Sequence, residues 1–138
     1  MGRILAIDFG TKRTGIAVTD TSKIIATGLA TVSTHEAIDF LKKYLAKEDV
    51  ECFVVGEPKR MNNQPAQAAT ATEQFIKQLQ KNFPGKEIKR EDERFTSKMA
   101  FQTMIDGGLG KKARQNKDLV DTISAAIILQ SYLERIGK

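Results

Sequence analysis

The sequence predicts a single α/β domain in which helices cover the faces of a mixed β-sheet. An apolar run from Ile4 to Ile7 opens the chain, and a second strand pattern at 51–56 follows a helical pattern. The 138 residues, 41% of them hydrophobic and 28% charged, suffice for one buried core. No internal repeat or low-complexity segment divides residues 1–138. We therefore expect one domain with the element order β-β-β-α-β-α-β-α-α.

The first three strands are predicted to form a meander. An apolar run ends at Asp8, Gly10 and Gly15 then interrupt it, and a second β-rich run covers residues 14–19. A polar turn leads into a third β-rich segment at 24–32. The first two strands are predicted to form a hairpin that places a carboxylate at its mouth.

Two helices are predicted to flank the fourth strand. Ser33 and Glu36 have the spacing of a capping box, so a helix should follow, with Ala37, Leu41, Tyr44 and Leu45 on its buried face. The strand at 51–56 comes after that helix, which favours parallel pairing through a right-handed crossover. The next helix begins near Pro65 and buries Ala68, Thr72, Phe75 and Leu79, and residues 83–85 end it.

The remaining elements are a less apolar strand at 87–92 and helices at 97–106 and 119–136. Phe95 and Thr96 provide a hydrophobic staple and an N-cap for the shorter helix. Residues 125–129 are apolar nearly all round the last helix, so we expect that helix to be largely buried.

Composition excludes several classes of protein. The single cysteine, Cys52, lies in an apolar run and has no partner for a disulfide or a zinc site, and the single histidine, His35, leaves no basis for a histidine-dependent triad. No apolar run approaches the ~20 residues of a membrane span, so we expect a cytoplasmic protein without a membrane partner.

The net charge of +5 permits an anionic partner. A glycine-rich basic loop at 107–117 carries Lys111, Lys112, Arg114 and Lys117 without an acid.

Acidic residues end three of the predicted strands. Asp8 closes the first strand, Glu57 follows the fourth, and Asp92 and Glu93 close the fifth. Ligands of open α/β sheets collect at the carboxyl ends of the strands, so these acids should share one edge. For Asp8 alone, the residues leave two interpretations open. The carboxylate either pairs with Lys12 or Arg13 or caps the turn, or it holds a metal ion or faces a phosphate.

The last helix adds Asp118 and Asp121, three residues apart and on one face. The simpler alternative is that Asp118 is the N-cap and Asp121 stabilises the first turn. Asp121, however, lies in line with Ala125, Ile128 and Tyr132. Converging carboxylates repel one another unless a hard divalent cation such as Mg²⁺ is bound between them. Such ions can activate water for in-line phosphodiester hydrolysis, so acids and a basic loop together indicate a nuclease.

Four motifs, in order, resemble those of the YqgF/RuvX family. They are Asp8-Phe-Gly-Thr-Lys-Arg-Thr-Gly15, Val55-Gly-x-Pro58 with Met61-Asn62, Asp92-Glu-Arg-Phe-Thr96, and Val120-Asp-x-x-Ser-Ala-Ala126 continuing to Gln130. The resemblance implies a ribonuclease-H-like fold whose five-stranded sheet has the order 3-2-1-4-5 with strand 2 antiparallel. It also implies a nuclease that matures the 5′ end of precursor 16S ribosomal RNA, within or outside a pre-ribosomal particle, or one that resolves Holliday junctions in branched DNA.

The resemblance also assigns roles to residues. Asp8, Glu93 and Asp121 correspond to the family's catalytic, metal-binding acids, with Mg²⁺ or Mn²⁺ as cofactor. Asp118 is a further candidate ligand because of its position beside Asp121 on the last helix, not because of the resemblance. Adjacent strand residues point to opposite faces, so of Asp92 and Glu93 we select Glu93. Glu57 is interpreted as a surface residue. The predicted substrate-binding cations are Lys12, Arg13 and Arg94 beside the acids and Lys111, Lys112, Arg114 and Lys117 on backbone phosphates. The alternatives are that Arg94 forms an ion pair with Asp8 or Glu93 and that the basic loop is simply solvated.

Other functions remain as alternatives. Asp8-x-Gly-Thr also resembles the phosphate loop of actin-like and sugar-kinase ATPases, but those enzymes close two domains over the nucleotide. A non-catalytic ribosome-assembly or transcription factor could retain the fold, although the presence of all three acids argues against it. Symmetric cutting of a two-fold junction needs a dimer, whereas trimming of an RNA end does not. We expect a monomer or a weak homodimer.

Overall fold

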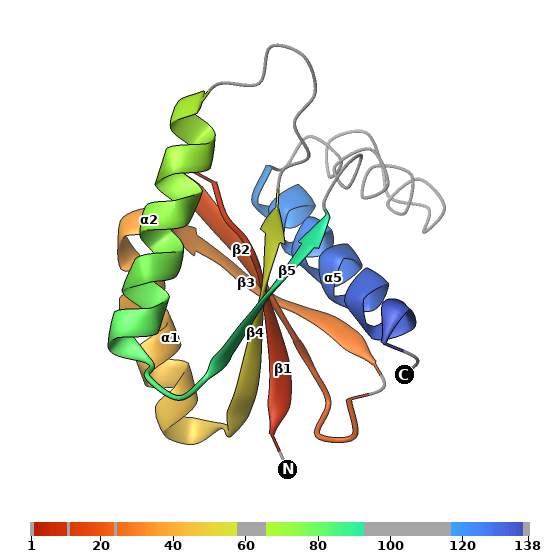
Figure 1. Ribbon diagram of the computed structural model, residues 1–138. Helices are drawn as coiled ribbons and strands as arrows, with labels where there is room; N and C mark the ends of the chain where they lie inside the picture. The colour runs from red at the N-terminus through yellow and green to blue at the C-terminus, as the bar shows by residue number, and fades with distance from the viewer. Residues whose placement is uncertain (1, 11, 24, 58–65, 93–116, 137–138) are drawn as a thin grey trace.

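The computed structural model describes residues 2–10, 12–23, 25–57, 66–92 and 117–136 (Figure 1). Its elements are β1 (Arg3–Asp8), β2 (Arg13–Thr19), β3 (Ala26–Ser33), the 3₁₀ turn η1 (Thr34–Glu36), α1 (Ala37–Lys47), β4 (Val50–Glu57), α2 (Ala66–Asn82), β5 (Glu87–Asp92) and α5 (Lys117–Arg135). The predicted helix at 97–106 lies outside the described residues. All the other predicted elements are present in the predicted order.

The five strands form one mixed sheet in the order β3-β2-β1-β4-β5, as the family resemblance implies. β2 runs antiparallel to both β1 and β3, whereas β4 is parallel to β1 and β5 is parallel to β4. β1 therefore lies at the centre and exposes no edge. β3 and β5 are the two outer strands.

Helices cover both faces of this sheet (Figure 1). Leu5 and Ile7 of β1 belong to a core cluster with residues of α1 and α2, while Ile4 and Ala6 belong to a second cluster with residues of α5. The alternation follows from the period of two along a strand, and it explains why β1 reads as a continuous apolar run. In the described part of the chain the architecture has three layers, with α1 and α2 on one face of the sheet and α5 on the other.

The helices bury the faces that their apolar periodicity predicts. Ala37 and Leu41 of α1 are fully buried, and Tyr44 and Leu45 pack against the same core cluster. Thr72, Phe75 and Leu79 of α2 are buried, and the side chain of Ala68 lies outside the described residues. In α5, Ala125, Ile128 and Leu129 are buried whereas Ala126 and Ile127 are only partly covered. Only one side of α5 meets the sheet, which explains the difference.

The predicted capping box at Ser33 is wrong. Ser33 makes no side-chain capping hydrogen bond, and the 3₁₀ turn η1 precedes α1, which begins at Ala37. The amide of Thr34 donates instead to the Lys12 carbonyl at 3.0 Å. The end of β3 is therefore tied to the β1–β2 turn, and this tertiary contact replaces the local cap.

Cys52 is a buried free thiol of the core, as expected. In the part of the chain that the structure describes, no helix is long and apolar enough to cross a membrane.

Candidate functional site

Asp8 lies at the carboxyl end of the central strand. Its backbone pairs with Gly15 of β2, and its side chain is half-buried. β4 and β5 run parallel to β1 and end at Glu57 and Asp92, so three carboxyl ends share one edge of the sheet. Both acids at these other strand ends have side chains outside the described residues. The backbone nevertheless confirms that three strands end in acids at the same edge.

The alternation of side chains assigns Asp8 to the face that α5 covers. Ile4 and Ala6 contact the α5 cluster, and Asp8 is the next residue of that series. Gly15, its partner on β2, belongs to the same face, because Ile16 beside it packs in the opposite core cluster. The carboxylate is thus presented toward the side of the sheet that carries α5.

A row of paired residues connects Asp8 with the beginning of α5. Asp8 pairs with Gly15, and Gly15 pairs with Thr31 of β3. The Thr31 hydroxyl forms a 2.5 Å hydrogen bond with the hydroxyl of Thr122 on α5. Three neighbouring strands span roughly 10 Å, so the first turns of α5 cross the sheet close to Asp8. Gly15 itself contributes no side chain to this face.

The glycine at position 28 brings the same helix close to β3. A Cβ atom at Gly28 would approach the Thr122 methyl group to 2.5 Å. β3 therefore supports α5 at Thr122 through a glycine contact and a hydrogen bond. Asp121 immediately precedes Thr122 in the helix.

The two aspartates of α5 are located by the backbone of the helix. Asp121 lies one turn before Ala125, at the start of the stripe that includes the buried Ile128 and Tyr132. α5 already includes Lys117 and Asp118, so an N-cap role for Asp118 would require the helix to start after the observed first residue. The side chains of these residues lie outside the described part.

The turn between β1 and β2 carries two of the predicted cations. Lys12 is exposed, and Arg13 is half-buried at the start of β2, where it pairs with Ser33. Gly10 is required here, because a Cβ atom at this position would overlap the Arg13 carbonyl oxygen. The turn therefore has a tight backbone with Lys12 at its solvent side.

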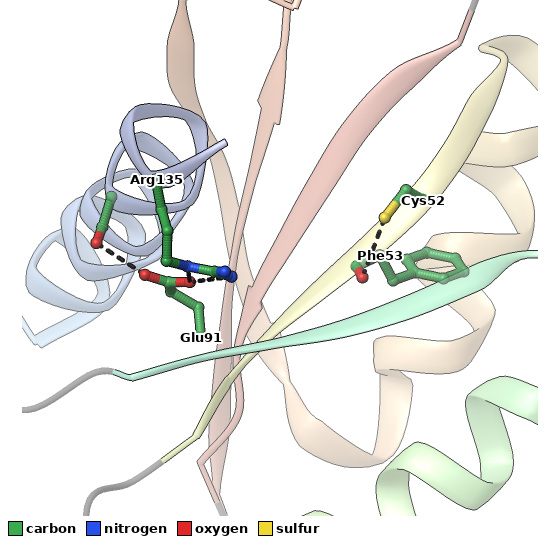
Figure 2. A network of polar contacts seen from close by, with 5 residues as sticks. Cys52, Phe53, Glu91 and Arg135 are labelled. Atoms are coloured by element: carbon green, nitrogen blue, oxygen red, sulfur yellow. Dashed lines mark hydrogen bonds and ion pairs between the residues drawn. The ribbon is translucent and has the colours of Figure 1, made fainter. Parts of the chain in front are cut away.

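The fifth strand contains a buried carboxylate that the sequence analysis missed. Glu91 is 7% exposed and accepts hydrogen bonds from Ser131 Oγ at 2.9 Å and from Arg135 Nε at 2.8 Å (Figure 2). It also forms an ion pair with Arg135 Nη2 at 2.8 Å. This network joins the end of β5 to α5. No local pattern distinguishes Glu91 from the exposed Glu87 of the same strand, so only the docking of α5 reveals it.

Several predicted site residues lie outside the described part of the chain. These are Glu93, Arg94, Lys111, Lys112 and Arg114 in full, and the side chain of Lys117. Among the side chains that the structure describes, no group of three His, Cys, Asp or Glu residues could hold a metal ion. Of the three predicted ligands, Asp8 is the one whose side chain is described.

A hollow of about 480 Å³ lies elsewhere on the molecule. Its lining includes Arg3, Val18, Leu29, Tyr44 and Glu48. Arg3 begins β1 and Asp8 ends it, so this hollow is at the opposite end of the central strand from Asp8. It is therefore not part of the candidate site.

Comparison with known proteins gives relatives along nearly the whole chain. A protein of Flavobacterium johnsoniae named "Putative pre-16S rRNA nuclease" is 60% identical over 133 residues, which cover 96% of each chain. Proteins with the same name from Phocaeicola vulgatus and Porphyromonas gingivalis are 59% and 54% identical, with 97% of this chain covered and 96% and 97% of theirs.

The solved structure of Thermus thermophilus RuvC in complex with a Holliday junction substrate superposes with a TM-score of 0.62. It is 18% identical, and the match covers 99% of this chain and 97% of RuvC. This likeness supports the ribonuclease-H-like fold that the motifs imply. The family model described as "RuvX: Holliday junction resolvase" matches residues 2–135. With this match and the close relatives, the chain belongs to the RuvX family.

Proposed function

We propose that this chain is a divalent-metal-dependent nuclease that hydrolyses phosphodiester bonds of structured nucleic acid, with the 5′ end of precursor 16S ribosomal RNA as its substrate. The names of relatives at 54–60% identity support the substrate. The acids at one edge of a ribonuclease-H-like sheet support the chemistry. Such processing takes place where ribosomes are assembled, so the proposal implies a cytoplasmic enzyme.

The hydrogen bond between Thr31 and Thr122 carries the proposal. It holds the beginning of α5 over the row that ends at Asp8, and Asp121 precedes Thr122 by one residue. Asp8 and Asp121 are thereby expected within reach of one another, although they are more than a hundred residues apart in the chain. Two carboxylates that approach each other in a partly buried site favour a bound cation.

Glu93 is the third proposed ligand. Glu91 is directed toward α5, as its bonds with Ser131 and Arg135 demonstrate. Because side chains alternate along a strand, the residue two positions later is expected on the α5 side too. This supports Glu93 rather than Asp92 as the acid that joins Asp8 and Asp121.

The proposed metal is Mg²⁺ or Mn²⁺, since carboxylate oxygens are the donors that these hard ions prefer. Asp8, Glu93 and Asp121 would hold it, with Asp118 as an additional candidate. When bound, the metal supplies an activated water and stabilises the leaving oxygen. Asp8 of β1 is held by its backbone pairing with Gly15 of β2, which would give the metal a ligand anchored in the central strand.

The cations have a separate proposed role. Lys12, Arg13 and Arg94 contact the phosphates next to the cut. The basic residues Lys111, Lys112, Arg114 and Lys117 contact backbone phosphates farther away and contribute salt-dependent affinity.

The decisive experiment is cleavage of a precursor 16S RNA with Mg²⁺ or Mn²⁺ by the wild type, Asp8→Asn and Asp121→Asn. Both variants should lose cleavage by at least 100-fold while retaining RNA binding. Asp39→Asn is a matched control, because Asp39 is exposed on α1, which covers the opposite face of the sheet. Equal cleavage by wild type and Asp8→Asn would refute the site. RNA binding without any cleavage would favour the non-catalytic assembly factor, and detectable ATP binding would revive the ATPase alternative.

Resolution of Holliday junctions is a second candidate, favoured by the description of the matching family. Resolution requires paired symmetric cuts and hence a dimer. Digestion of a four-way DNA junction in parallel with the RNA, combined with sedimentation, separates the two activities. Paired cuts by a dimer would identify a resolvase, whereas RNA cleavage by a monomer would identify the processing nuclease.

A further inference from the structure

A chain of hydrogen bonds ties the β1–β2 turn to the first residue after β3. The Gly10 carbonyl can only accept, so the Thr34 hydroxyl donates its one hydrogen to it, at 2.5 Å. The hydroxyl of the fully buried Thr14 must then donate to Thr34 Oγ1, at 2.9 Å. The Thr34 amide donates to the Lys12 carbonyl at 3.0 Å. A single residue therefore holds the turn at both Gly10 and Lys12.

Asp8 and its neighbour Phe9 have anchors outside this chain of bonds. Asp8 is held by its pairing with Gly15, and the next residue, Phe9, stacks on Phe75 of α2 with a centroid distance of 4.8 Å. Gly10 and Lys12 lie beyond these anchors, in the part of the turn that Thr34 holds. Loss of the Thr34 hydroxyl should thus release the turn around Lys12 without displacing Asp8.

We propose that Thr34 is a positioning residue that fixes the β1–β2 turn so that Lys12 can engage a substrate phosphate. The proposal rests on the proposed function, which assigns Lys12 to substrate binding. Thr34 itself does not contact the substrate. It acts through the turn backbone, which is so tight that a Cβ atom at Gly10 would overlap the Arg13 carbonyl oxygen.

The test is the salt dependence of RNA binding, measured without divalent metal by fluorescence anisotropy of a labelled precursor 16S RNA fragment. Lys12→Ala should weaken binding and lower the slope of log K against log salt by about one. Thr34→Val removes no charge, yet it should lower the slope by a similar amount and weaken binding several-fold. Thr34→Ser keeps the hydroxyl and should show the wild-type affinity and the wild-type salt slope. Thr27→Val alters an exposed threonine of β3 and should change neither.

The double variant Thr34→Val/Lys12→Ala should bind no more weakly than Lys12→Ala alone. Thr34→Val with a lowered melting temperature but an unchanged slope would overturn the proposal, as would additive effects in the double variant. In either case Lys12→Ala still reports on the proposed function by itself. Cleavage assays add a second readout, in which Thr34→Val should raise KM while the half-saturating Mg²⁺ concentration stays the same.

Discussion

The buried carboxylate of Glu91 should contribute strongly to stability through its contacts with α5. Glu91→Gln keeps the shape of the side chain but removes its charge and replaces one acceptor oxygen with an amide NH2 group, which cannot accept a hydrogen bond from Ser131 or Arg135. Glu91 is 7% exposed, whereas Arg135 is 56% exposed. Partial solvation of the arginine weakens the pair, and removal of a buried charge offsets part of the loss. We expect the free energy of unfolding to fall by roughly 1–2 kcal/mol.

The same strand provides a control. Glu87 pairs with Lys89 at 3.1 Å, but the two side chains are 69% and 49% exposed. An exposed pair of this kind contributes about 0–1 kcal/mol, so Glu87→Gln should change stability by less than about 0.5 kcal/mol. The two substitutions are chemically identical and differ only in burial and partners.

The assay is urea unfolding followed by circular dichroism, with thermal unfolding as a second measurement. A loss of 1–2 kcal/mol corresponds to a decrease in Tm of roughly 5 °C for a chain of this size. Arg135→Met should cost a similar amount, because it leaves Ser131 as the remaining donor to Glu91. The double variant should cost about 1 kcal/mol less than the sum of the single variants. The reasoning would be refuted if Glu91→Gln destabilised the protein no more than Glu87→Gln. It would also be refuted if the losses of unfolding free energy from Glu91→Gln and Arg135→Met were strictly additive in the double variant.

Three further predictions concern pH, backbone space and electrostatics. Burial raises the pKa of the Cys52 thiol to about 11, above the ~8.5 of an unfolded thiol. Between these two pH values the unfolded chain releases the thiol proton while the native state keeps it. The free energy of unfolding should therefore fall as pH rises from about 8.5 to 11. Urea titrations of Cys52→Ala across that range should lack this part of the pH dependence. Gly10→Ala should lower the free energy of unfolding by about 1–3 kcal/mol in thermal unfolding, because the added methyl group overlaps the Arg13 carbonyl oxygen. The same substitution should weaken RNA binding. Wild-type stability and binding would contradict the described backbone of the β1–β2 turn. Replacing Lys111 and Lys112 by alanine should lower the salt slope of RNA binding by about one to two, with kcat at saturating RNA unchanged.

Much of the fold could be predicted because its signals are periodic and local. The unbroken apolar run of β1 indicated a strand covered on both faces, and both core clusters indeed contain its residues. The helix before β4 indicated parallel pairing, which the register with β1 confirms. The capping box failed because the residues near Ser33 bond to the distant β1–β2 turn instead of to their own helix.

The candidate site, like the fold, has features that could be predicted from the sequence and features that could not. The sequence by itself predicted which acids and cations form the site, since Asp8, Glu93 and Asp121 each belong to a motif that can be recognised without coordinates. Only the tertiary structure decided how α5 is held over the sheet. Thr31 and Thr122 are 91 residues apart in sequence, and their hydrogen bond exists because strand register and helix docking bring them together. The burial of Glu91 and the contacts of Thr34 likewise depend on packing between segments that are distant in sequence. They could not be predicted, because such packing leaves no periodic signal in the chain.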